Sequence, residues 1–189
     1  MNLTVHNFLK NSKIKKKYIC KEQDGSNLTP EISWSKIKDA ASYALIIEDP
    51  DARPSLNVVP STFIHWYIPY ISKDIQKISS LLLSGIHNLN SFIKNNSIKN
   101  NSIQYNSIQL LNGKNTLGEL GYHGPCAPNG TGIHRYIFTI YALDSLLEIN
   151  QNNIKIVDSK DFCNILKKAN ITILNKESTI FYYSYKDYS

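Results

Sequence analysis

Three short segments of the chain place titratable side chains in otherwise apolar or glycine-rich surroundings. The first is Glu48-Asp49-Pro50-Asp51, at the end of a strand-like run. Strand alternation puts Asp49 on the same face as the apolar Leu45, and Glu48 on the opposite face. Burying an unpaired carboxylate is costly, so an inward-facing Asp49 needs a partner. Asp-Pro-Asp is also favourable turn chemistry, which leaves Asp51 to hold a turn.

The second and third segments carry histidines. His65 lies in the apolar run Phe63-Ile-His-Trp-Tyr67, where a lone histidine is more often a hydrogen-bonded core residue than a ligand contact. The third segment, Gly121 to Tyr136, begins as a loop rich in glycine and proline, and inward-pointing amides in such a loop make an anion-binding concavity. Alternation then places His134 and Tyr136 on one strand face and Arg135 on the other.

Together these segments predict an anion pocket. Asp49 would orient one imidazole, while His65, His134 and Tyr136 would offer donors to the anion. A phosphoryl or ester hydrolase with His134 and Asp49 as acid and base is the main alternative. A metal site made of His65, His134 and Asp49 is a weaker one, because the surrounding donors favour an anion over a cation. No nucleophile elbow is legible, so we predict no catalytic residue, metal or cofactor.

The elements that must position these residues are mainly strands. Strand-like stretches cover Ser42–Glu48, Thr62–Ile68 and His134–Ala142, and a β-rich segment closes the chain. Apolar residues at helical spacing predict one helix over about 159–169, with Asp158 or Ser159 as N-cap. Without βαβ alternation, the pattern favours a mostly β fold, an antiparallel β-sandwich with a short C-terminal helix.

Residues 95–109 read NNSIK-NNSIQ-YNSIQ, a period of five that fits neither a strand nor a helix. We interpret 87–112 as a low-complexity surface insertion, flexible and outside the core, within a single domain spanning 1–189. An Ile-bearing edge strand is the less favoured alternative. A protein whose Asn-rich insertion does the binding is a third functional hypothesis.

Composition narrows the class of protein. The chain has 189 residues, 42% of them hydrophobic, and a net charge of +6 carried almost entirely by lysine. The few arginines and the absence of a recognition motif argue against a nucleic-acid partner. Neither a bilayer-spanning run nor a signal peptide is visible. The three cysteines, Cys20, Cys126 and Cys163, fit no disulfide framework or zinc pattern, so a reducing, cytoplasmic location is expected.

The motifs nonetheless resemble a known family. Asp49-Pro-Asp-Ala52, Phe63-Ile-His-Trp66, Gly124-Pro-Cys-Ala-Pro128 and Gly130-Thr-Gly-Ile-His-Arg-Tyr136, in this order, resemble the phosphatidylethanolamine-binding proteins, which include the Raf kinase inhibitor proteins. The resemblance runs from about Asn27 to Asp144 and is nearer to the bacterial-type branch. The sequence departs from the usual family pattern at three places. Ala127 stands where proline is common, Arg53 separates Ala52 from Pro54, and the insertion at 87–112 is additional.

The resemblance implies a β-sandwich with a small anion pocket and a structural role for Asp51. The implied lining is Asp49, His65, Gly124, Pro128, His134 and Tyr136, with Pro125 and Cys126 on the rim. It further implies a non-enzymatic binding and regulatory protein that captures a phosphate-bearing small molecule or phospholipid headgroup and modulates a protein kinase. A peripheral contact with a membrane surface would fit the positive charge.

Overall fold

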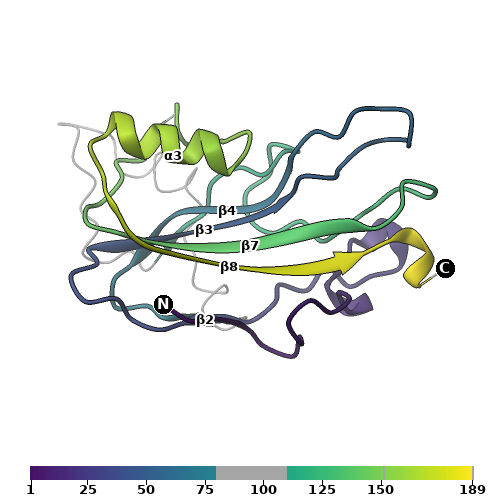
Figure 1. The fold of residues 1–189 in the computed structure, drawn as a ribbon, viewed down its shortest axis with the longest axis horizontal. Helices are drawn as coiled ribbons and strands as arrows, with labels where there is room; N and C mark the ends of the chain where they lie inside the picture. The colour runs from purple at the N-terminus through teal and green to yellow at the C-terminus, as the bar shows by residue number, and fades with distance from the viewer. Residues whose placement is uncertain (80–109, 151, 189) are drawn as a thin grey trace.

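The computed structural model describes residues 1–79, 110–150 and 152–188, and its elements are mostly strands (Figure 1). The strands are β1 Leu3–Val5, β2 Ile32–Trp34, β3 Ser42–Asp49, β4 Phe63–Ser72, β5 Lys77–Ile78, β6 Leu110–Leu111, β7 His134–Leu143 and β8 Ile173–Tyr183. The helices are α3 Ser159–Lys168 and the short 3-10 turns η1 Lys16–Tyr18, η2 Lys21–Gln23 and η4 Tyr185–Asp187.

These strands form two antiparallel sheets. The larger has the order β6-β4-β3-β7-β8, and the smaller has the order β1-β2-β5. Figure 1 shows the smaller sheet on one face of the larger one and α3 on the other. The mostly β, antiparallel sandwich predicted from the sequence is confirmed.

Alternation along β3 builds a core on both faces of the larger sheet. Leu45 and Ile47 pack in the apolar cluster shared with the smaller sheet, while Ala44 and Ile46 pack in the cluster beneath α3. The side chain of Asp49 continues the Leu45 and Ile47 face and is buried. The pattern of this strand therefore carries a carboxylate to the end of the inter-sheet core.

Helix α3 matches its predicted limits. The Asp158 side chain accepts a hydrogen bond from the Asp161 amide at 2.8 Å, which confirms Asp158 as N-cap. Glu48 projects from the helix-covered face of β3 and accepts from the Ser159 amide at 2.9 Å. A carboxylate at this end of a helix is favoured by the helix dipole. In the described parts of the chain, no helix combines the length and apolar character that crossing a bilayer requires.

Strand β4 is longer than the Thr62–Ile68 stretch expected, because it continues through Pro69. Its pairing with β3 shifts register between Tyr43 and Leu45, which leaves an extra β4 residue at the proline. Pro69 has no amide proton to donate to the neighbouring strand, and a bulge is a position where a strand tolerates such a residue.

The insertion was predicted to extend too far. The repeats at 95–109 lie outside the described residues, but Leu110 and Leu111 are buried and pair with β4 as strand β6. Asn112 accepts a hydrogen bond from the Trp66 indole at 2.8 Å. Leu110 and Leu111 therefore belong to the core and Asn112 is bonded to it, so the predicted boundary at 112 is wrong. Buried apolar pairing overrides the Asn-rich context that precedes it.

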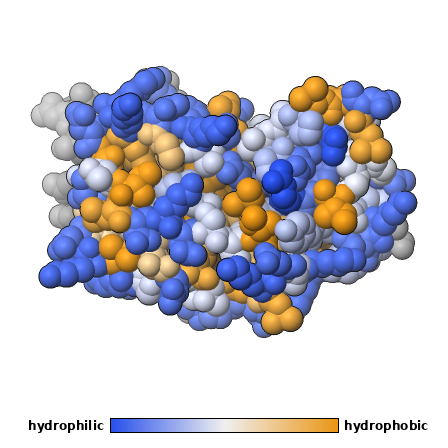
Figure 2. All heavy atoms as spheres, in the orientation of Figure 1, coloured by the Kyte–Doolittle hydropathy of each residue, from blue (hydrophilic) through white to orange (hydrophobic). Residues whose placement is uncertain are grey.

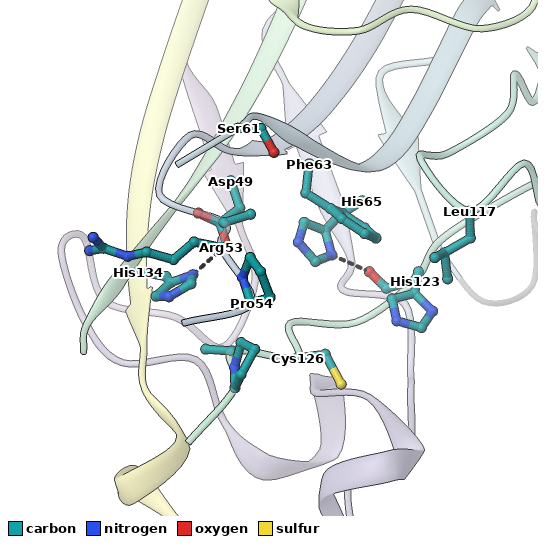
Figure 3. A pocket seen from close by; sticks show the side chains of 13 residues that line it. Asp49, Arg53, Pro54, Ser61, Phe63, His65, Leu117, His123, Cys126 and His134 are labelled. Atoms are coloured by element: carbon teal, nitrogen blue, oxygen red, sulfur yellow. Dashed lines mark hydrogen bonds and ion pairs between the residues drawn. The ribbon is translucent and has the colours of Figure 1, made fainter. Parts of the chain in front are cut away.

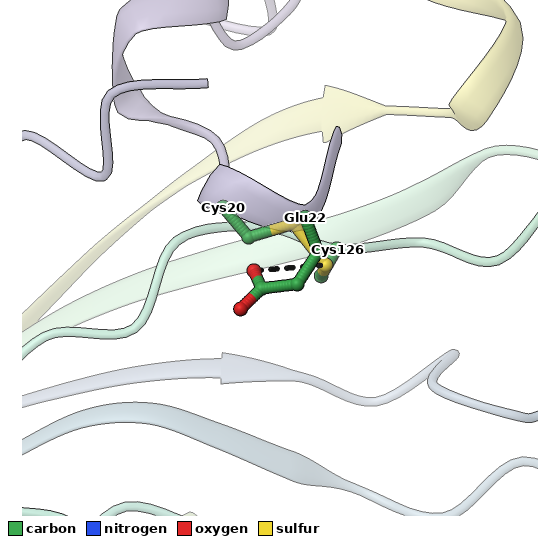
Figure 4. Close-up of side chains that lie close together, drawn as sticks. All are labelled: Cys20, Glu22 and Cys126. Carbon is green, nitrogen blue, oxygen red and sulfur yellow. Dashed lines mark hydrogen bonds between the residues drawn. A yellow bond between two sulfur atoms is a disulfide. The ribbon is translucent and has the colours of Figure 1, made fainter. Parts of the chain in front are cut away.

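The expectation that the cysteines form no disulfide is also wrong. Cys20 and Cys126 are bonded although they lie 106 residues apart, and Cys163 is not bonded (Figure 4). The fold brings the start of η2 against the glycine- and proline-rich loop, where the Cys20 amide donates to the Pro125 carbonyl at 3.0 Å. Glu22 Oε2 lies 3.9 Å from Cys126 Sγ, a contact only, since a disulfide sulfur has no proton. The cysteine argument for a reducing compartment therefore does not hold.

Candidate functional site

A cavity of about 370 Å³ opens where β3 ends and where β4 and β7 begin (Figure 3). Its volume lies in the range of small-molecule sites. The lining residues are Asp49, Ala52, Arg53, Pro54, Ser61, Phe63, His65, Leu117, His123, Cys126, Ala127, Pro128 and His134. The antiparallel order of the larger sheet brings the three chemistry-bearing segments of the sequence to this one end.

Asp49 and His134 form a buried pair in the cavity floor. Asp49 Oδ2 lies 2.8 Å from His134 Nδ1, and the two side chains are only 3% and 1% exposed. The other oxygen of Asp49 accepts from the Asp51 amide at 2.8 Å. The prediction that Asp49 orients an imidazole is confirmed by this geometry, and the partner is His134.

The second nitrogen of His134 is also engaged. Nε2 lies 2.9 Å from the hydroxyl of Thr131, which donates its one proton to the Pro128 carbonyl at 2.7 Å. The hydroxyl must therefore accept from Nε2. Both ring nitrogens of His134 are thus occupied by the protein. His134 can reach neither an anion nor a metal without giving up one of these contacts.

The order carboxylate, imidazole, hydroxyl also occurs in catalytic triads. Here the hydroxyl belongs to Thr131, which is completely buried and is not part of the cavity lining. Its proton points to a carbonyl rather than to the imidazole. A substrate in the cavity therefore meets no activated nucleophile at this position.

His65 is held in one tautomer. Its Nδ1 lies 2.7 Å from the His123 carbonyl oxygen, which can only accept, so Nδ1 carries the proton. Figure 3 shows the other ring nitrogen on the side facing Asp49. Burial lowers the pKa of His65 to about 4, against a smaller opposing effect of the His123 carbonyl and the Asp49 carboxylate. At neutral pH, Nε2 is thus an acceptor, not the donor that the sequence predicted.

The pKa of His65 makes a prediction about stability. In the unfolded chain, a histidine titrates near 6.5, whereas in the folded protein His65 stays neutral down to about pH 4. The unfolded state therefore binds more protons in this window, and stability falls as the pH falls through it. We expect a loss of about 3 kcal/mol between pH 7 and pH 4 from this group. Urea unfolding of the wild type and of His65→Asn across this range measures it, since the variant should lack this component.

Two cavity residues that the sequence reasoning did not assign to the site are Arg53 and His123. The Nε of Arg53 is buried, and neither side chain has a hydrogen-bond partner among the residues that the structure describes. Figure 3 places Arg53 on the side of Asp49 and His134, and His123 on the opposite side. Arg53 stood out in the sequence only as an interruption before a proline, and His123 only as the residue before Gly124.

The rim of the cavity is apolar on one side. Residues 54–61, between β3 and β4, contain no charged residue, and Leu56, Val58 and Val59 are exposed there. Figure 2 shows hydrophobic atoms gathered on this projecting loop, at the upper right. This part of the rim offers no positive charge to an anion. Among the described residues that line the cavity, Arg53 is the one with a permanent positive charge.

Three of the predicted site residues lie behind the lining. The Gly124 amide donates to Asn27 Oδ1 at 2.6 Å, and Pro125 accepts from the Cys20 amide. Tyr136 is buried, with its ring centroid 5.2 Å from that of His65. Burial and the nearby Asp49 carboxylate raise the pKa of its hydroxyl well above the usual value. These residues shape the wall, while Asp49, His65, Cys126, Pro128 and His134 reach the cavity.

Asp51 has the structural role expected of it. Its two oxygens accept from the Arg135 guanidinium at 2.7 Å each, and Oδ2 also accepts from the Arg135 amide at 3.0 Å. The guanidinium lowers the pKa of Asp51 and keeps it ionised. This pair fixes the turn after β3 to the start of β7, and so keeps Asp49 and His134 in register.

Comparison with known proteins agrees with this architecture. A family model described as phosphatidylethanolamine-binding protein matches residues 4–184. A UPF0098 protein of Methanothermobacter thermautotrophicus is 35% identical over 150 residues, which cover 79% of this chain and 80% of the relative. A UPF0098 protein of Chlamydia trachomatis is 34% identical over 148 residues, which cover 78% of this chain and 79% of the relative.

Solved structures give the same result. The crystal structure of a phosphatidylethanolamine-binding protein homologue, CT736 of Chlamydia trachomatis, superimposes with a TM-score of 0.66 and 27% identity, over 96% of this chain and 95% of the other. YbcL of E. coli gives a TM-score of 0.64 at 17% identity, over 96% of each chain, and supports the fold alone. The chain therefore belongs to the phosphatidylethanolamine-binding protein family, in its bacterial-type branch.

Proposed function

We propose that this protein is a non-enzymatic binding protein that holds a phosphate-bearing group in the cavity at the end of the larger sheet. The observation that carries the proposal is the convergence on one cavity of the Asp49–His134 pair, His65 and Arg53, whose Nε has no partner among the described residues. Arginine is well suited to phosphate because its planar donors match the oxygens. Family membership supports a binding role.

A phosphorylated side chain presents the same group as a phosphorylated headgroup or small molecule. The proposal therefore extends to modulation of a protein kinase, which rests on the resemblance to the Raf kinase inhibitor proteins. Phosphoserine and phosphotyrosine, titrated against the unphosphorylated amino acids, test whether such a side chain can be held. Equal affinity with and without the phosphate would remove the kinase part of the proposal.

A phosphorus NMR titration of phosphorylethanolamine with the purified protein tests the binding role. We expect a saturable shift or broadening of the ligand signal, and at least a tenfold loss of affinity in His65→Asn. The asparagine amide can still donate to the His123 carbonyl, so this variant removes Nε2 and keeps the anchoring contact. Val157→Ser, at an exposed position, is the matched control and should bind as the wild type does.

The same spectra test the hydrolase alternative. A binding protein leaves no new inorganic phosphate signal over hours of incubation. Growth of that signal in proportion to protein, and its absence with His134→Ala, would establish an enzyme and overturn the proposal.

A further inference from the structure

We propose that Cys20, Glu22 and Cys126 form a second site, which binds one zinc-like divalent cation when the disulfide is reduced. Two thiolates and one carboxylate hold the ion, and a water fills the fourth position of the tetrahedron. Thiolate ligands select zinc over the harder magnesium and calcium ions. The site adjoins the cavity through Cys126, but the inference does not depend on the proposed function.

The ligand atoms already lie close together in the oxidised protein. The two sulfurs and a carboxylate oxygen of Glu22 are within 4.8 Å of one another, and Glu22 Oε2 is 3.9 Å from Cys126 Sγ (Figure 4). With Zn–S bonds of about 2.3 Å and Zn–O bonds of about 2.0–2.2 Å, neighbouring ligand atoms of a tetrahedral zinc ion are about 3.6–3.8 Å apart. The carboxylate is therefore near its required place, and the two sulfurs have to separate once their bond is broken.

The two segments that carry the ligands are joined by more than the disulfide. The Cys20 amide donates to the Pro125 carbonyl at 3.0 Å, and the Gln23 side-chain amide donates to the Ala127 carbonyl at 2.8 Å. Gln23 is itself held by the Tyr183 hydroxyl, which donates to its Oε1 at 2.6 Å. Reduction therefore leaves two thiols facing each other on segments that stay in contact, and a metal site needs such supporting bonds behind its ligands.

The site is open to solvent on one side. Cys20 is completely buried, whereas Cys126 is half-buried and Glu22 is exposed, so a reductant and a metal ion have a way in. Within the described ranges, none of the ion pairs involves Glu22, which leaves its carboxylate uncommitted to a cation. Two thiolates and a carboxylate at this spacing repel one another, and a divalent cation among them turns that repulsion into attraction.

Metal binding is coupled to the redox state of the cysteines. A dithiol passes two electrons and two protons to the Cys20–Cys126 bond, which gives two thiols and converts the dithiol to a disulfide. Zn²⁺ then displaces both thiol protons and forms two Zn–S bonds, while the ionised carboxylate of Glu22 binds without losing a proton. Because the same sulfurs are used, bound metal opposes re-formation of the disulfide.

The experiment uses the full chain carrying Cys163→Ser, so that only the two cysteines of the site can offer thiols. The protein is reduced with dithiothreitol, desalted under argon and titrated with Co²⁺, which occupies zinc sites and absorbs in the near ultraviolet when thiolates bind it. We expect this absorption to saturate at one Co²⁺ per chain, and one equivalent of Zn²⁺ to remove it. The oxidised protein should show no such absorption.

Two variants test the third ligand. Glu22→Gln replaces the carboxylate with a neutral amide and should lower the Co²⁺ affinity of the reduced protein by at least about tenfold, since even a change behind a metal ligand typically costs that much. Asp24→Asn makes the same change of charge at the end of the same turn, outside the ligand group, and should bind as the parent does. Equal affinity in Glu22→Gln and the parent would overturn the three-ligand site.

Tryptophan emission shows whether the reduced chain is folded, because Trp34 and Trp66 are both buried. If reduction unfolds the chain, one equivalent of Zn²⁺ should restore the emission of the oxidised protein, since binding to the folded site then drives folding. No cobalt–thiolate absorption in a folded reduced chain, or no recovery of an unfolded one, would overturn the inference. Equal Co²⁺ affinity of the oxidised protein in calorimetry would place the ion elsewhere and overturn it too. Each of these results leaves the proposed phosphate binding untouched.

Discussion

Asp49→Ala should lower the free energy of unfolding by about 3–5 kcal/mol, which is typical of breaking a buried ion pair by removing one partner. His134, whose side chain is only 1% exposed, would be left with Nδ1 without its protein partner. The Asp51 amide would lose its acceptor as well. Both losses leave a polar group without its protein partner, which costs stability.

Urea unfolding at pH 7 measures this loss, and Asp51→Ala is the matched control. Asp51 pairs with the Arg135 guanidinium, but the Arg135 side chain is 49% exposed, and solvent screens such pairs. We expect the control to lose about 1 kcal/mol or less. Asp49→Asn should fall between the two, because its amide oxygen can still accept one hydrogen bond. Equal losses for Asp49→Ala and Asp51→Ala would show that the Asp49–His134 pair contributes no more than an exposed one.

The placement of Asp49 could be predicted because it follows from local pattern. Alternation along β3 sends Leu45, Ile47 and Asp49 to one face and Glu48 to the other, and this needs no knowledge of the partner strands. The same reasoning gave His134 and Arg135 their opposite faces. The alternation of side chains along a strand is a local property of the chain, so these face assignments agree with the structure.

The hydrogen-bond partners inside the site could not be predicted. Whether His65 offers a donor or an acceptor is decided by the His123 carbonyl, which arrives from a loop 58 residues later. His134 loses its free nitrogen to Thr131, a residue that the sequence marks only as part of a glycine-rich loop. Loop geometry depends on tertiary contacts. The sequence pattern can therefore identify the residues of the site, but it does not show which histidine nitrogens carry protons or whether each one donates or accepts a hydrogen bond.

Arg53 illustrates the same limit. In the sequence it is one cation in a turn, and most such side chains are solvated. Only the packing of the β3–β4 loop against the cavity buries its Nε and leaves it without a partner among the described residues. The residue that separates Ala52 from Pro54 is therefore the one that brings a permanent positive charge to the lining formed by the described residues.

Removing the disulfide should have an effect of similar size to removing Asp49. The double variant Cys20→Ser, Cys126→Ser removes the disulfide between residues 106 positions apart. The loss is expected to lower the free energy of unfolding by about 2–5 kcal/mol. The mechanism acts largely on the unfolded chain, whose conformational freedom increases when the link is absent. Cys163→Ser is the control, since Cys163 forms no disulfide, and it should unfold close to the wild-type midpoint.

Wild-type protein with and without reductant distinguishes the effect of the disulfide from that of the two side-chain substitutions. Loss of stability on adding reductant, matching that of the double variant, is the expected result. Three titratable thiols in the untreated protein and no response to reductant would contradict the Cys20–Cys126 bond.

The same samples show what the disulfide does for the cavity. The loop that carries Cys126, Ala127 and Pro128 into the lining keeps two hydrogen bonds to residues 20–23 when the disulfide is cut. These are the Cys20 amide on the Pro125 carbonyl and the Gln23 amide on the Ala127 carbonyl at 2.8 Å. If those two bonds suffice, phosphorylethanolamine binds the reduced protein with unchanged affinity, and the disulfide acts on stability alone. Weaker binding at a temperature where the reduced protein is still folded would make the disulfide part of the site, because it would be holding the wall that the ligand touches.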